Sequence, residues 1–130
     1  MRQSKSTDII AELGFIDEIR RMRAIIDDWI GQASREIRPL LEWQFVARSK
    51  YFRPLTIFGC YRALSNDRIP DTIIRSAAVL EMMHNVTLII DDIVDESDER
   101  RGKATLHRKF GLLPALMLGQ SHRVGLRNLA

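Results

Sequence analysis

The sequence predicts an all-α fold, a helical bundle, from three observations. Apolar residues recur at three- and four-residue steps along most of the 130 residues, which is the spacing of one helix face. No stretch alternates cleanly between apolar and polar residues, and the hairpin dipeptides Asn-Gly and Asp-Gly are absent. The composition is 45% hydrophobic and 28% charged, and a single cysteine, Cys60, rules out an intrachain disulfide. These numbers suit one globular domain.

The N-terminal part of the chain predicts two helices. Thr7 and Asp8 suit the N-cap of a first helix, and helical apolar spacing continues to Gly31, a residue that ends or bends helices. A second segment, from about residue 33 to residue 49, carries the same spacing. We therefore expect a long helix and then a shorter one before residue 50.

Three further helices are expected after that point. Pro54 suits the first turn of a third helix, where its missing N–H costs nothing, and this helix runs to about residue 65. Residues 71–94 are rich in small and apolar side chains and predict one long, well-buried central helix. A polar connection, residues 95–111, then leads to a last helix that begins near Leu113.

The stretch LIIDDIVDESDERRG, residues 88–102, combines acidic and basic side chains. Asp91 and Asp95 are four residues apart and share a helix face with His84, two turns earlier, so we expect the three to project into one cleft. Two carboxylates this close repel each other unless a cation lies between them. Carboxylates together with substrate phosphate oxygens are ligands that Mg²⁺ prefers.

Arg100 and Arg101 follow directly and suit a diphosphate clamp, since guanidinium groups bind phosphate oxygens in pairs. The stretch thus predicts a Mg²⁺–diphosphate site. A solvated acidic helix end followed by a basic loop is the alternative that the charge pattern leaves open.

A second basic group, in SKYFRP, strengthens the diphosphate interpretation. Lys50 and Arg53 come just before or at the start of the Pro54 helix, whose N-terminus offers free N–H groups and the positive end of the helix dipole. Alone, these two would be ordinary surface cations. With residues 88–102, the chain contains two separate groups suited to a diphosphate.

The segments SKYFRP and LEMMHNVTLIIDDIVDESDERRGKATLHRKFG, in this order and at this separation, resemble the trans-isoprenyl (polyprenyl) diphosphate synthase family over roughly residues 35–118. DDIVD matches the family's first aspartate-rich motif, DDxxD. The resemblance implies the N-terminal portion of the isoprenoid synthase fold. It also implies a Mg²⁺-dependent prenyltransferase that condenses isopentenyl diphosphate with an allylic diphosphate.

The same resemblance implies roles for the residues that match the motifs. Asp91 and Asp95 would be catalytic and would bind the Mg²⁺ ions that hold the allylic diphosphate, with Asp92 as a less direct contributor to the metal site. Arg100 would contact that diphosphate. Four basic side chains would hold isopentenyl diphosphate: Lys50, Arg53, His84 and Arg101.

The chain departs from the family pattern in three ways. Ser49 stands where the basic motif has a glycine, and Phe52 is also atypical there. No second aspartate-rich motif follows, and residues 119–130 do not continue the family's apolar helix. We therefore expect residues 1–130 to form a single partial domain, the N-terminal half of a synthase-like domain. A truncated or frameshifted product, inactive by itself, is the corresponding expectation.

Two alternatives remain from the sequence. The chain could be a non-catalytic subunit or regulator of a full-length prenyl synthase, and a homo- or hetero-oligomer with a synthase subunit is expected in either case. Glu81 and His84 form a Glu-x-x-His spacing, as in di-iron helical bundles, although such sites need two copies.

Charge and hydropathy limit which other classes of protein fit the sequence. The net charge of +3 comes from scattered basic residues, so we expect no nucleic-acid binding. No run approaches about 18 apolar residues, and the N-terminus lacks the apolar core of a signal peptide. We therefore expect no transmembrane segment and a cytoplasmic location.

Overall fold

The computed structural model of the chain describes residues 9–45 and 49–126. Its elements are α2 (Ile16–Gly31), α3 (Arg38–Phe45), α4 (Phe52–Ser65), α5 (Asp71–Val94), β1 (Glu99–Arg100), β2 (Lys103–Ala104), α6 (Leu106–Phe110) and α7 (Leu112–Leu126). The all-α prediction is confirmed, and the long helix at Asp71–Val94 has the predicted bounds.

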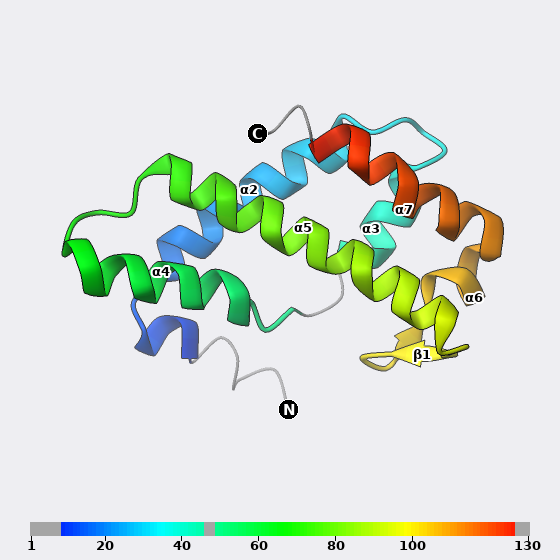
Figure 1. Ribbon diagram of the computed structural model, residues 1–130. Coiled ribbons are helices and arrows are strands. Elements are labelled where there is room, and N and C mark those ends of the chain that lie inside the picture. The colour runs from blue at the N-terminus through cyan, green and yellow to red at the C-terminus, as the bar shows by residue number, and fades with distance from the viewer. Residues whose placement is uncertain (1–8, 46–48, 127–130) are drawn as a thin grey trace.

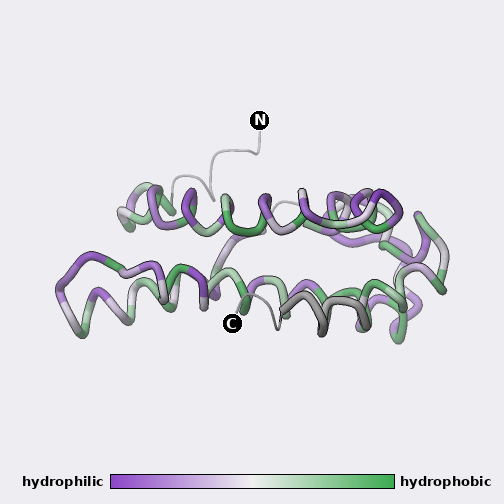
Figure 2. The backbone as a smooth tube through the Cα atoms, turned by 90° about the horizontal axis from the view of Figure 1, so that it is seen from above, coloured by the Kyte–Doolittle hydropathy of each residue, from purple (hydrophilic) through white to green (hydrophobic). Residues whose placement is uncertain are grey.

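Helix α5 crosses the middle of the molecule and packs against α2, α4 and α7 (Figure 1). Viewed from above, the helices lie in two layers (Figure 2). Ala77 and Ala78 on α5 are fully buried, and their small side chains allow neighbouring helices to approach closely. Ile19, Met22 and Ile26 form the buried stripe of α2, at the three- and four-residue steps seen in the sequence. This core fixes the position of α5 relative to the helices around it.

The prediction of one uninterrupted helix up to Gly31 is wrong, because the chain turns at residues 13–15 before α2 begins. Gly14 adopts a positive φ of 72°, which glycine reaches without steric cost. The Arg62 guanidinium binds both carbonyl groups freed there, at 3.1 Å from Leu13 O and 3.2 Å from Gly14 O. The predicted caps Thr7 and Asp8 lie outside the described residues.

Other boundaries shift by a few residues. The second helix begins at Arg38 rather than near residue 33, because Arg38 donates to the carbonyl groups of Gly31 and Ala33 in the preceding turn. Helix α4 begins at Phe52, which keeps Pro54 within the first turn. Helix α7 begins at Leu112, one residue before the predicted start.

The segment expected as a plain polar connection contains a hairpin. Strands β1 and β2 pair antiparallel, with Glu99 opposite Ala104 and Arg100 opposite Lys103. The two-residue loop, Arg101 and Gly102, has φ values of 53° and 78°, the pattern of a type I′ turn. The hairpin is followed by the short helix α6.

Among the described helices, α5 is long and apolar enough by composition to cross a membrane, with a hydropathy of 1.4 in its most apolar window. The core helix of a soluble protein meets the same criterion, and 39% of this window is buried. The expected lack of a transmembrane segment therefore stays a prediction.

Candidate functional site

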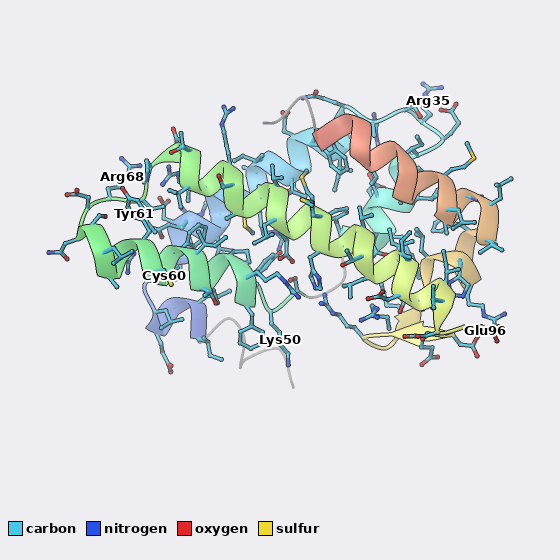
Figure 3. The ribbon with its side chains drawn as sticks, in the orientation of Figure 1. Arg35, Lys50, Cys60, Tyr61, Arg68 and Glu96 are labelled. Carbon is cyan, nitrogen blue, oxygen red and sulfur yellow. The ribbon has the colours of Figure 1, made fainter. Side chains whose placement is uncertain are left out.

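One pocket gathers four of the five basic side chains that the sequence singled out. It has a volume of about 440 Å³. Its lining residues are Ser49, Lys50, Tyr51, Phe52, Arg53, Glu81, His84 and Arg101. They come from the segment leading into α4, where Figure 3 labels Lys50, from the middle of α5, and from the hairpin loop. Residues up to 52 positions apart in the printed sequence, Ser49 and Arg101 at the extremes, thus meet at one cationic surface.

The segment leading into α4 is a tight turn built around Tyr51. Its φ of 52° lies in the left-handed region, which a bulky residue adopts only under constraint. The Tyr51 N–H donates to Ser49 Oγ at 3.2 Å, and the Tyr51 carbonyl accepts from Leu55 N at 2.9 Å. This turn puts Lys50 before the helix and Arg53 in its first turn, beside backbone N–H groups that lack helical partners. The combination suits an anion.

Helix α5 contributes Glu81 and His84, one turn apart. Glu81 is buried, with 3% of its surface exposed, and its carboxylate accepts a hydrogen bond from Ser49 Oγ at 2.7 Å. Burial lowers the pKa of His84 below its usual value, and the Arg53 charge lowers it further, while Glu81 opposes the shift. The lowered pKa favours the neutral imidazole, which has one ring N–H to donate.

The two neighbouring arginines of the hairpin have different surroundings. Arg100 hydrogen-bonds the buried Asp92 carboxylate through Nε, at 2.9 Å from each oxygen, and through Nη2, at 2.7 Å from Oδ1. The Asp92 hydrogen bond raises the pKa of Arg100 above its usual range. Arg101 instead lines the pocket with Lys50. Of the two arginines predicted to form a diphosphate clamp, Arg100 is therefore paired with a buried aspartate and Arg101 belongs to the pocket wall.

Asp91 and Asp95 are exposed near the C-terminal end of α5, where Asp95 N donates to Asp91 O at 2.8 Å. His84 lines the pocket, and neither aspartate does. Within residues 9–45 and 49–126, no three His, Cys, Asp or Glu side chains form a group that could hold a metal ion. The two exposed carboxylates are hard oxygen donors suited to Mg²⁺, but as a pair they supply only part of a ligand set. The metal assignment stays a prediction.

Sequence reasoning assigned no role to Ser49 or Tyr51, and considered Glu81 only for the di-iron alternative, although all three line the pocket. Ser49 was visible only as a departure from the family glycine. Glu81 was visible as the one acidic residue in the apolar stretch TIIRSAAVLEMM. Its bond to Ser49 also occupies a carboxylate oxygen that the di-iron alternative would need for metal.

The structure thus combines an all-α fold with a cationic pocket and, on the same central helix or at its end, two exposed aspartates. The family model described as polyprenyl synthetase matches residues 34–125, and the chain belongs to this family. The match extends on both sides of the predicted range of 35–118.

Relatives and solved structures agree with this assignment. A short chain isoprenyl diphosphate synthase of Methanocaldococcus jannaschii is 36% identical over 104 residues, which is 80% of this chain and 29% of that protein. A farnesyl diphosphate synthase of Geobacillus stearothermophilus is 35% identical over 86 residues, or 65% of this chain and 28% of the relative.

Among structures, a polyprenyl synthase from Caulobacter crescentus, complexed with calcium and isoprenyl diphosphate, superposes with a TM-score of 0.81 at 25% identity. That match covers 99% of this chain and 38% of the other. A decaprenyl diphosphate synthase from Rhodobacter capsulatus matches with a TM-score of 0.76 at 23% identity, covering 96% and 37%. The chain therefore spans well under half the length of these proteins, and the isoprenoid synthase fold is confirmed for the part it contains.

Proposed function

We propose that this chain supplies one wall of a prenyltransferase site, the wall that binds isopentenyl diphosphate and begins the metal site for an allylic diphosphate. The observation that carries the proposal is the common pocket of Lys50, Arg53, His84 and Arg101. A diphosphate brings several negative charges, and cations from separate elements can neutralise them without a large rearrangement. In the reaction, the allylic carbon–oxygen bond breaks, the isopentenyl double bond attacks that carbon, and a proton leaves.

The roles follow from what each group can donate. Lys50 contributes a point charge, and the arginines contribute planar pairs of N–H donors. His84 donates a ring N–H to a phosphate oxygen. Asp91 and Asp95 would hold Mg²⁺, and the bound ion would neutralise charge on the leaving diphosphate.

The proposal predicts binding that titration calorimetry can measure. The chain is titrated with isopentenyl diphosphate and separately with geranyl diphosphate, with and without Mg²⁺. Arg53→Ala should weaken isopentenyl diphosphate binding about tenfold, because one charge-assisted hydrogen bond is lost. The double variant Asp91→Ala, Asp95→Ala should remove the Mg²⁺-dependent part of geranyl diphosphate binding. Equal affinities in the wild type and both variants would reject the proposal.

A second role, as a subunit that associates with a prenyl synthase chain, is favoured by the apolar surface of two neighbouring helices. The exposed large apolar side chains on α5 and α7 are Leu80, Met83, Ile90, Val94, Leu112, Leu113, Leu116 and Met117. Apolar surface of this extent is typical of an interface. Sedimentation velocity should detect self-association or a complex with a full-length synthase. A monomer that stays separate from the synthase at high concentration would count against this role.

A further inference from the structure

A serine on the segment leading into α4 is hydrogen-bonded to a buried glutamate on α5. Ser49 Oγ donates to Glu81 Oε1 at 2.7 Å and accepts from the Tyr51 N–H at 3.2 Å. We propose that Ser49 is a positioning residue of the diphosphate pocket, whose hydroxyl couples Glu81 to the left-handed turn and so holds Lys50 and Arg53 in place. This inference rests on the proposed diphosphate-binding function.

The buried carboxylate fixes the orientation of the serine hydroxyl. Glu81 is 3% exposed, and a buried acidic side chain needs hydrogen-bond donors in place of water. Hydrogen bonds from a hydroxyl to a carboxylate are short and strong, which fits the 2.7 Å separation. With its hydrogen directed at Glu81, the Ser49 oxygen can present only lone pairs to its other neighbour, the Tyr51 N–H.

Glu81 is itself held in the helical core. Its backbone carbonyl accepts from Asn85 Nδ2 at 2.9 Å, and Asn85 Oδ1 accepts from Gln44 Nε2 at 3.5 Å. The second of these bonds joins α5 to α3, so the anchor for Ser49 belongs to the packed part of the molecule.

The turn needs this anchor because Tyr51 has an unfavourable backbone conformation. An aromatic residue at φ 52° persists only when its surroundings constrain it. The constraints are the bond to Ser49 Oγ, the bond from Leu55 N to the Tyr51 carbonyl, and the Arg23 guanidinium 6.0 Å from the Tyr51 ring centroid. Losing the first would let the turn relax, and the side chains before and after Tyr51 would change direction. These include Lys50, directly before Tyr51, and Arg53, two residues after it.

The test is the affinity of the full chain for inorganic pyrophosphate, measured by titration calorimetry. Ser49→Ala should weaken binding about tenfold, since a hydrogen bond to a charged group is lost. Ser49→Thr keeps the hydroxyl and should stay within about threefold of the wild type. The matched control is Ser76→Ala on the exposed face of α5, where the hydroxyl donates only to the Thr72 carbonyl at 2.9 Å. This control should bind like the wild type.

A double-mutant cycle separates positioning from a general loss of stability. If Ser49 acts through Lys50, then Ser49→Ala should weaken pyrophosphate binding much less in a Lys50→Ala background. Fully additive effects, or equal losses in Ser49→Thr and Ser49→Ala, would overturn the inference. Unchanged binding in Lys50→Ala and Arg53→Ala would instead reject the proposed function.

Amide hydrogen exchange tests the turn without any ligand. The Tyr51 N–H should exchange at least several-fold faster in Ser49→Ala than in the wild type or in Ser76→Ala, because its acceptor is gone. An unchanged Tyr51 exchange rate would overturn the positioning role even if pyrophosphate binding failed in every variant.

Discussion

Two groups of charges at α5 differ in how their charges are balanced. At one, Asp92 and Arg100 satisfy each other through three hydrogen bonds, and the Asp92 side chain is 5% exposed. At the other, the pocket that contains Lys50 and Arg53, neither of these cations forms an ion pair with an acidic side chain in the part of the chain that the structure describes. We call these the Asp92–Arg100 pair and the cationic pocket.

The difference teaches which charges maintain the fold and which are available to a ligand. The buried Asp92 carboxylate is neutralised by the Arg100 guanidinium, whereas clustered cations repel one another until an anion arrives. The hairpin joins the two groups, because Arg100 and Arg101 are adjacent and belong to different groups. Anything that shifts the hairpin should therefore disturb both.

The largest expected effect comes from breaking the Asp92–Arg100 pair. Arg100→Ala leaves the Asp92 carboxylate buried without its partner, and this should lower the free energy of unfolding by about 3 kcal/mol. We choose the lower end of the usual range because the Arg100 side chain is 34% exposed. Urea denaturation followed by circular dichroism measures the change.

Arg108→Ala is the matched control for that substitution. Arg108 pairs with Asp98, and the two side chains are 55% and 72% exposed, so solvent screens the pair. Its loss should cost less than about 1 kcal/mol. If the Arg100 and Arg108 variants are equally stable, the distinction between a fold-maintaining pair and a surface pair is wrong.

The next largest effect is expected at Trp43, the α3 side chain that contacts the hairpin. Trp43 Nε1 donates to the Ala104 carbonyl at 3.0 Å, and Lys103 Nζ lies 4.3 Å from the Trp43 ring centroid while donating to the Trp43 carbonyl at 2.8 Å. Trp43→Phe removes the first bond and weakens the cation–π contact, so it should destabilise the fold by about 1.5 kcal/mol.

Because the hairpin carries both arginines, Trp43→Phe should also weaken pyrophosphate binding. Calorimetry on the folded variant measures this, with Trp29→Phe as control, since Trp29 lies on α2 and its ring packs edge-on against Phe45. Normal pyrophosphate affinity in Trp43→Phe would mean that the hairpin position does not matter to the pocket.

A smaller effect is expected from the turn between Arg100 and Lys103. Gly102 has a φ of 78°, so Gly102→Ala should destabilise the protein by about 1 kcal/mol through the left-handed backbone. Gly59→Ala, in the middle of α4 with open space around the new methyl group, should instead stabilise it by about 0.5–1 kcal/mol. Thermal melts of the two variants should move in opposite directions, and the same sign for both would contradict the type I′ assignment.

Most of the helical fold could be predicted because apolar spacing is a local property. This spacing predicted the bounds of α5 and the face of α2 that is buried. The break at Gly14 could not be predicted, because it depends on Arg62, 48 residues away, which binds the freed carbonyl groups. The hairpin was missed because its loop is Arg-Gly rather than the commoner Asn-Gly or Asp-Gly.

The candidate site was predictable as a set of residues but not as an arrangement. Periodicity groups His84 with Asp91 and Asp95, yet the pocket joins His84 to Lys50 and Arg101. The pocket forms where three separate segments meet, and helical spacing predicts only which residues of one segment share a face. Likewise, the sequence cannot show that Asp92 is buried while Asp91 and Asp95 are exposed.

The smallest expected effect is a change in the pKa of His84, and its sign tests the geometry of the pocket. Burial and Arg53 lower this pKa, whereas Glu81 raises it. Arg53→Ala should therefore raise the pKa of His84, and Glu81→Gln should lower it further. Both can be followed by NMR titration of the imidazole Hε1 resonance.

The lowered pKa also sets a pH dependence of folding. The unfolded chain binds a proton at His84 more readily than the folded chain does, so stability is complete above the unfolded pKa of about 6.5 and declines as pH falls toward the folded pKa. Arg53→Ala should reduce this decline. A bound diphosphate should reverse it, because negative charge favours the protonated imidazole, and binding should then tighten as pH falls through the same range. Equal pKa values for His84 in the wild type and in Arg53→Ala would mean that Arg53 does not face the imidazole, and the pocket would lose one of its four basic groups.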